Sequence, residues 1–142
     1  MTDLDQDAVR TLVHRPAVDV LPGATVRAVA QTLAAESVGV AVVHARSRPG
    51  PGLRVAGLVS ERDIVQWIAD GSDPDTARAE DLMTTELASV RPGESIRTAA
   101  LRMLDNDVRH LPVVDGDTVV GVISMRDTLQ ALLAGEADAH AV

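Results

Sequence analysis

The chain has 142 residues, enough for one compact domain or two small paired halves. It contains no cysteine, which excludes disulfides, thiolate metal sites and cysteine nucleophiles. Its formal net charge is −8, and an acidic surface repels the phosphate backbone of nucleic acids, so we expect no DNA or RNA partner.

The sequence also argues against a membrane-spanning segment and against a ligand pocket lined by aromatic side chains. No apolar run approaches the roughly 18 residues of a membrane-spanning helix, and the segment from Met1 to Gln6 is too acidic for a signal peptide. We therefore expect a cytoplasmic protein. Trp67 is the only residue among Phe, Trp and Tyr, so a base-binding pocket would have to be lined by aliphatic groups and backbone.

Two stretches of the chain repeat each other. Pro22-Gly23 matches Pro92-Gly93 at an offset of 70 positions, and the block that begins at Gly57 matches the block that begins at Gly121 at an offset of 64. The first copy thus carries six extra residues between its two matching blocks. They fall within 44–54, where Pro49-Gly50-Pro51-Gly52 predicts a loop.

Each copy predicts the same elements in the same order. A short extended segment ends at the Pro-Gly turn, and Thr25 or Ser95 then caps a helix with an apolar face at i, i+3, i+4 and i+7. Two β-branched strands follow, joined in the second copy by a hairpin at Asp115-Gly116. The predicted strands span 38–43 and 55–59 in the first copy, and 108–114 and 118–123 in the second. A last helix opens at Ser60 or Ser124 and ends near Gly71 or Gly135.

The predicted fold class is therefore α/β (α+β), with the order β-α-β-β-α in each copy. We expect repeat one at 9–70, a linker at 71–79, repeat two at 80–134 and a flexible tail at 135–142. A single repeat of roughly 60 residues buries too little surface to be more than marginally stable by itself. We therefore expect the two to pack sheet to sheet with pseudo-two-fold symmetry.

The repeated Gly-x-x-Ser-x-Arg-Asp block carries the strongest chemical signal. A serine followed three residues later by an acidic residue is the pattern of a helix capping box, which is a purely structural role. The block nevertheless occurs twice, and both times it lies at a strand-to-helix junction where free N–H groups attract anions. A carboxylate suits the donor hydroxyls of ribose, and an arginine suits phosphate.

The sequence offers little support for a metal site or for catalysis. The histidines lack metal-ligand spacing and have no cysteine partners. A nucleotide hydrolase using Asp127 or His110 is one alternative, but no catalytic triad or phosphate-loop motif accompanies these residues. We expect no enzymatic activity.

At these motifs the chain resembles the CBS-domain family, specifically a tandem CBS pair (a Bateman module). The resemblance covers roughly Val9 to Leu133. It is carried by Glu80-Asp81-Leu82-Met83-Thr84, Val90-Arg91-Pro92, the segment from Val108 to Asp115, and the two Gly-x-x-Ser-x-Arg-Asp blocks.

The resemblance implies clefts that bind adenosine ligands such as AMP, ADP, ATP or S-adenosylmethionine. By this resemblance, Asp63 and Asp127 would bind the ribose hydroxyls, and Ser60 and Ser124 would bind the ribose or the phosphate. Thr84 would lie near the second site. The strand openings would surround the base, and they consist of Val38, Gly39, Val40, Val108, Arg109, His110, Leu111 and Pro112. The candidates for phosphate contact are the four basic residues Arg62, Arg109, His110 and Arg126.

The two copies differ where a ligand would bind. Val13-His14 replaces Met83-Thr84, and the first copy has Gly39-Val40 where the second has Arg109-His110. We therefore expect unequal sites, with the second-copy site the stronger. The main hypothesis is a nucleotide-sensing regulatory module that forms a homodimer and acts on an unidentified effector protein. The alternative is a structural or protein-interaction dimer that binds no nucleotide.

Overall fold

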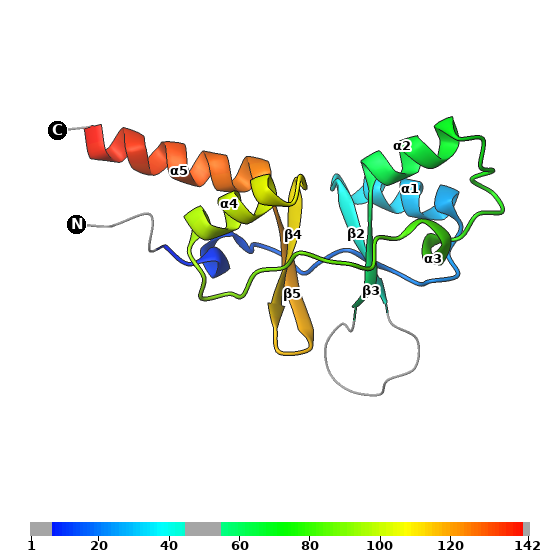
Figure 1. Cartoon of the computed structure of the whole chain (residues 1–142), viewed down its shortest axis with the longest axis horizontal. Coiled ribbons are helices and arrows are strands. Elements are labelled where there is room, and N and C mark those ends of the chain that lie inside the picture. The colour runs from blue at the N-terminus through cyan, green and yellow to red at the C-terminus, as the bar shows by residue number, and fades with distance from the viewer. Residues whose placement is uncertain (1–6, 45–54, 141–142) are drawn as a thin grey trace. The chain divides into compact units, whose positions relative to one another are not determined.

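Two compact units make up the chain. The computed structural model describes residues 7–44 and 55–140, so the predicted loop at Pro49-Gly50-Pro51-Gly52 lies outside the described residues. One unit is Ala17–Leu87, and the other combines Met1–Pro16 with Ala88–Val142. We call them the first-repeat unit and the second-repeat unit, and each is described by itself (Figure 1).

The first-repeat unit is a three-stranded sheet with helices. Its elements are β1 (Asp19–Val20), α1 (Val26–Glu36), β2 (Val40–His44), β3 (Val55–Ser60), α2 (Glu61–Ala69) and α3 (Ala79–Leu82). The strand order is β1-β2-β3, with β1 parallel and β3 antiparallel to β2. The predicted end of α2 is confirmed: Gly71 has φ +93°, and its N–H donates to the carbonyl of Ile68 at 3.0 Å.

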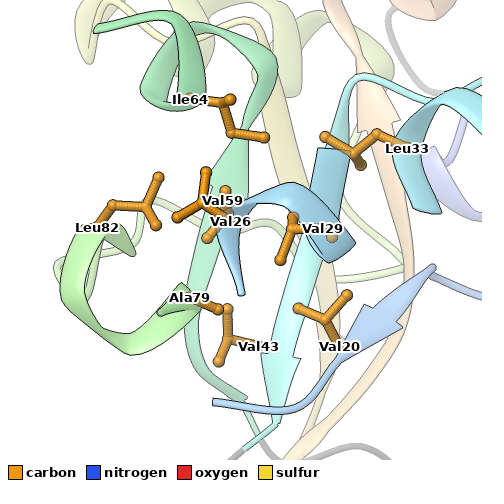
Figure 2. Close-up of a cluster of buried hydrophobic side chains, with 10 residues drawn as sticks. Val20, Val26, Val29, Leu33, Val43, Val59, Ile64, Ala79 and Leu82 are labelled. Atoms are coloured by element: carbon orange, nitrogen blue, oxygen red, sulfur yellow. The ribbon is translucent and has the colours of Figure 1, made fainter. Parts of the chain in front are cut away.

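Aliphatic side chains from the sheet and the helices form the core of this unit. Val26, Val29 and Leu33 lie on the buried face of α1, as the periodicity predicted. Figure 2 shows them gathered with side chains from β1, β2, β3, α2 and α3. Thr25 caps α1, because its Oγ1 accepts the N–H of Ala28 at 3.1 Å. The cluster consists of Val20, Val26, Val29, Leu33, Ala41, Val43, Val59, Ile64, Ala79 and Leu82.

The second-repeat unit repeats this plan with a shorter sheet. It contains a 3₁₀ helix (Val9–Leu12), α4 (Ile96–Asp105), β4 (His110–Asp115), β5 (Thr118–Ser124) and α5 (Met125–His140). Strands β4 and β5 pair antiparallel and turn at Gly116, whose φ of +62° suits a hairpin. In place of a β1 equivalent, Val90 makes a single parallel bridge to Val113.

The last helix is longer than the sequence predicted. Helix α5 continues through Gly135 to His140, so the expected helix end near Gly135 is wrong. One internal glycine destabilises a helix by only about 1 kcal/mol relative to alanine. The residues that follow, Glu136-Ala137-Asp138-Ala139, include two alanines, which have the highest helix propensity.

Each repeat is completed by a short segment from the start of the other repeat. Residues 77–84, which we call the central strap, belong to the first-repeat unit. Val26, the first residue of α1, donates its N–H to Ala77 at 2.9 Å, and Ala79 donates to Ala24 at 2.8 Å. Ala79 and Leu82 are buried in the first-repeat core.

The N-terminal strap, residues 7–14, makes the matching contacts in the second-repeat unit. Ile96, the first residue of α4, donates its N–H to Asp7 at 2.9 Å, and Val9 donates to Glu94 at 2.8 Å. Val9 is fully buried in the second-repeat core. Every one of these positions lies 70 residues from its counterpart in the other unit. The compact units therefore differ from the sequence repeats, because the segment that opens each repeat packs on the other.

The glycine of the repeated block makes room for these straps. A Cβ at Gly57 would lie 2.7 Å from the carbonyl oxygen of Thr84 and 2.9 Å from Cγ of Met83. A Cβ at Gly121 would lie 2.6 Å from Cγ1 of Val13. The packing of the straps thus explains why both copies have glycine here.

Candidate functional site: two serine–aspartate corners

Both repeated blocks fold into the same corner between a strand and a helix. At the start of α2, Asp63 donates its N–H to Oγ of Ser60 at 3.1 Å, and Ser60 donates its N–H to Oδ2 of Asp63 at 2.8 Å. At the start of α5, the same two bonds join Asp127 and Ser124 at 3.0 Å and 3.1 Å. The capping-box role predicted for these residues is therefore confirmed.

The capping box leaves part of each carboxylate unused. Within the described residues, the bonds of Asp63 and Asp127 involve Oδ2 and the backbone N–H, and Oδ1 accepts no hydrogen bond. Both side chains are half-buried at the surface. An ionised carboxylate has about four acceptor positions. Each corner can therefore cap its helix and still accept a hydrogen bond that a hydroxyl of a bound molecule donates.

The opening of the neighbouring strand is fixed beside each corner. Val40 pairs with Ser60 across the sheet, and the N–H of Glu61 donates to the carbonyl of Gly39 at 2.9 Å. In the other unit, His110 pairs with Ser124, and Met125 donates to Arg109 at 2.7 Å.

The preceding helix ends hold these strand openings in the same way in both units. Ser37 and Asp107 have φ of 54° and 51°, the left-handed conformation of a helix C-terminus. Directly after them, the N–H of Val38 donates to Leu33 at 3.1 Å. That of Val108 donates to Met103 at 3.0 Å. Backbone hydrogen bonds therefore join the strand opening to the corner and to the preceding helix end in each unit.

The structure divides the predicted site residues between the two units. The first-repeat unit brings together Val38, Gly39, Val40, Ser60, Arg62, Asp63 and Thr84. The second-repeat unit brings together Val108, Arg109, His110, Leu111, Pro112, Ser124, Arg126 and Asp127.

Three of these predicted residues do not present a side chain at the surface. Leu111 is fully buried in the second-repeat core, beside Met103 and Ile123, and Pro112 and Val40 are buried as well. Strand β4 has buried residues in succession rather than in alternation, so its sequence did not indicate which residues face outward. The Arg62, Arg109 and Arg126 side chains are exposed.

Thr84 lies in the first-repeat unit, which the sequence did not predict. Its N–H and carbonyl both bond to Leu58, at 2.9 Å and 3.0 Å. Leu58 lies two residues before Ser60, so Thr84 stands beside the first-repeat corner within its own unit. The matching strap position in the second-repeat unit is His14, which follows Val13 at Gly121.

His14 is the residue that the sequence comparison assigned to the other copy. The alignment placed Val13-His14 with the first repeat because they lie at its start in the chain. The reciprocal strap packing moves His14 to the second-repeat unit. The 70-residue offset could have identified the position, but the exchange between repeats carries no local sequence signal.

The two corners differ in formal charge. The first has Glu61 and Asp63 against Arg62, which sums to −1. The second has Asp127 against Arg109 and Arg126, which sums to +1 with histidines counted as neutral. The position of Glu61 is taken by Met125 in the second corner. The second corner is therefore better suited to an anionic group.

A separate hollow lies on the surface of the second-repeat unit, on α4. Its volume is about 430 Å³, and no predicted site residue lines it. It is lined by Ala88, Thr98, Leu101, Arg102, Asp105 and Asn106. Arg102 donates to both carboxylate oxygens of Glu94, at 2.8 Å and 3.1 Å.

Two negative findings apply to the described residues alone. Across 7–44 and 55–140, no group of three histidine or acidic side chains could hold a metal ion. In the same part of the chain, no helix is both long enough and apolar enough to cross a bilayer.

Comparison with known proteins agrees with this geometry. The family model of the CBS domain matches residues 9–70 and 79–134. The chain belongs to the CBS domain family. Its nearly complete coverage by two matches shows a tandem CBS pair, as the resemblance predicted.

Curated relatives of this chain are longer proteins. One is an uncharacterized protein of Methanopyrus kandleri, 27% identical over 126 residues, which cover 87% of this chain and 61% of that protein. Another is the mitochondrial CBS domain-containing protein CBSX3 of Arabidopsis thaliana, 30% identical over 112 residues, which cover 77% of this chain and 53% of that protein. The CBS pair therefore spans little more than half the length of these two relatives.

Solved CBS structures match over almost the whole chain. A CBS domain protein from Pyrobaculum aerophilum, complexed with AMP, has a TM-score of 0.78 and 33% identity, and the match covers 90% of this chain and 99% of that one. A CBS-domain protein from Agrobacterium tumefaciens has a TM-score of 0.80 and 25% identity, with 89% and 94% covered.

Proposed function

We propose that this CBS pair is a non-enzymatic regulatory module that binds adenosine nucleotides. The observation that carries the proposal is the pair of corners, each of which leaves one carboxylate oxygen of Asp63 or Asp127 without a hydrogen bond among the described residues. The AMP complex of the Pyrobaculum aerophilum protein, at 33% identity, supports the same ligand class.

The chemistry of each corner matches the parts of a nucleotide. Ribose hydroxyls donate, and Oδ1 of the aspartate accepts. Phosphate oxygens accept, and the exposed guanidinium groups of Arg62, Arg109 and Arg126 donate. The base would lie against the backbone and aliphatic groups at the strand openings, beginning at Val38 and Val108. Aromatic stacking on Phe or Tyr is excluded, because the chain has neither residue and its single aromatic side chain is Trp67.

Regulation would follow from differential binding. A ligand shifts a conformational equilibrium only as far as its affinities for the two conformations differ. Occupied corners would thus favour one arrangement of the protein, which an effector protein or a second copy of the chain would recognise. No catalytic step is part of the proposal: incubation with ATP and magnesium is expected to leave the ATP intact by chromatography.

A panel of AMP, ADP, ATP and S-adenosylmethionine tests the proposal by calorimetry and by thermal unfolding. A ligand that binds only the native state stabilises it by about 2.7 kcal/mol at a concentration of 100 Kd. We expect heat of binding and a raised Tm for at least one of the four. Folded protein that shows neither effect at millimolar concentrations would exclude nucleotide sensing.

A structural or protein-interaction role is the second candidate function. It is favoured by the fact that the serine and aspartate of each corner already serve as a helix cap. Under this alternative, nucleotides leave the Tm unchanged, and the same panel therefore separates the two functions.

A further inference from the structure

The hollow on α4 belongs to the second-repeat unit alone and shares no residue with either corner. Ala88 and the helix C-cap Asn106 form part of its lining. The other lining residues are spaced at i, i+3, i+4 and i+7, so they form one stripe along the helix. They are Thr98, Leu101, Arg102 and Asp105.

The charges that line the hollow do not balance. The guanidinium of Arg102 is neutralised, because it donates to both carboxylate oxygens of Glu94, at 2.8 Å and 3.1 Å. Asp105 is exposed, and its carboxylate makes no hydrogen bond or ion pair with another described residue. The side-chain amide of Asn106 donates to the carbonyl of Arg102 at 2.8 Å, which leaves its Oδ1 as a further acceptor. The hollow therefore offers acceptors and one uncompensated negative charge.

The end of the helix adds to this preference for a cation. Asp105 is the last residue of α4, and Asn106 is its C-cap. The C-terminus of a helix carries a partial negative charge, which stabilises a cation placed beside it. Leu101 lies one turn earlier and is 49% exposed, so it offers an apolar contact next to the acceptors. This order of groups matches a side chain with an apolar stem and a cationic end.

The first repeat does not supply the same groups. At the offset of 70 positions, helix α1 has Gln31, Thr32 and Ala35 in place of the apolar, the ion-paired and the acidic residue. The fold that the two repeats share therefore does not require Asp105. The lining of the hollow is a property of the second-repeat unit, and each chain has it once.

We propose that the hollow on α4 is a docking site for an arginine side chain of a partner protein. The guanidinium donates to the carboxylate of Asp105 and to Oδ1 of Asn106, and its methylene groups pack on Leu101. Arginine fits better than lysine, because its fork of donors reaches two acceptors at once. The formal net charge of −8 attracts a basic partner to this surface. The site has no residue in common with the nucleotide corners, so the inference does not depend on the proposed function.

NMR titration of the isotope-labelled full chain with the peptide acetyl-Ala-Ala-Arg-Ala-Ala-amide tests the proposal. We expect saturable shifts of the backbone amide signals of Leu101, Asp105 and Asn106, and no shifts from a peptide with glutamine in place of arginine. Asp105→Asn should weaken binding of the arginine peptide by about three- to fivefold, the effect of losing a partly exposed ion pair.

Asp107→Asn is the matched control, because it removes the same charge from a residue that does not line the hollow. Asparagine also tolerates the φ of 51° at this position. This variant should bind the arginine peptide as the native chain does. Both aspartates are exposed, so both variants should have the Tm of the native chain.

Three results would overturn the docking site. The first is a folded chain in which the arginine peptide shifts no signal around the hollow. The second is an equal loss of affinity in Asp105→Asn and Asp107→Asn, which would show attraction to the net charge alone. The third is a change in the sedimentation of Asp105→Asn, which would place a second copy of the chain, and not a partner protein, in the hollow. A chain that binds the arginine peptide but no nucleotide would overturn the proposed function and leave this inference in place.

Discussion

Gly57 and Gly121 occupy equivalent positions, but different atoms lie close to them. The closest atom to a Cβ at Gly121 belongs to the side chain of Val13, at 2.6 Å, whereas at Gly57 it is the backbone oxygen of Thr84, at 2.7 Å. A side chain can be shortened, but a backbone oxygen that is bonded to Leu58 cannot move without breaking that pairing. The two glycines should therefore respond differently to the same substitution.

We predict that Gly121→Ala and Gly57→Ala each destabilise the protein by about 1–3 kcal/mol, the usual effect of overpacking. Val13→Ala should rescue Gly121→Ala, because it removes the crowded methyl groups. Met83→Ala should not rescue Gly57→Ala, because the contact with the Thr84 oxygen persists. Urea unfolding of the single and double variants measures this. Equal rescue at both positions would show that the backbone contact is unimportant.

The carboxylate of Glu94 couples stability to pH. Hydrogen bonds from Arg102, and then from the N–H of Arg91, hold the pKa of Glu94 below its ordinary value of 4.5. The backbone carbonyl of the same residue accepts the N–H of Val9, so Glu94 also anchors the N-terminal strap. A carboxyl whose pKa is lowered by folding stabilises the protein above its ordinary pKa, and the contribution is lost as pH falls through the folded value.

We therefore expect Glu94→Gln to destabilise the protein at neutral pH, with a difference from the native chain that shrinks as the pH falls below 4.5. Urea unfolding across that range measures the change. Asp75→Asn is the control, because it removes a fully exposed pair with Arg27, and exposed pairs contribute little. A constant difference at all pH values would contradict the ionic origin of the effect.

Among the elements, the straps were the least predictable. The helices α1 and α4 followed from apolar periodicity and from the caps Thr25 and Ser95, and the corners followed from the spacing of serine and aspartate. These features are local, so the sequence encodes them directly. The packing of Val9 on the second repeat is a long-range pairing, and a short apolar segment does not specify its partner. For this reason the serine–aspartate corners were predicted, whereas the grouping of Thr84 and His14 was not.

Truncation of the fully buried Val9 tests the strap packing. Val9→Ala should lower the free energy of unfolding by about 1–3 kcal/mol, because a large-to-small change in a core leaves a cavity. Thr11→Ala, on an exposed strap residue, should have a much smaller effect. Urea unfolding monitored by far-ultraviolet circular dichroism provides the values. A Val9→Ala variant as stable as the native chain would show that the strap does not contribute to the second-repeat core.

For the whole molecule, we expect a homodimer. Helices α4 and α5 pack against each other (Figure 1). They leave four large apolar side chains exposed, Leu101, Leu104, Leu129 and Leu133. An apolar surface of this kind is typical of protein–protein contacts. Leu129→Asp with Leu133→Asp should shift sedimentation toward the monomer, and Leu21→Asp, on an exposed leucine of the first-repeat unit, should not. A native chain that sediments as a monomer at high concentration would contradict the prediction.

Titration of AMP into the native chain and into aspartate variants tests nucleotide binding by the corners most directly. The variants are Asp63→Ala, Asp127→Ala and the double variant, and the free energy of unfolding of each is measured as well. Loss of a helix cap alone lowers stability by about 0.5–2 kcal/mol and leaves affinity untouched. We predict that each single variant loses the binding at its own corner, that the double variant binds no AMP, and that all three remain folded. A folded double variant that binds AMP as tightly as the native chain would contradict this prediction.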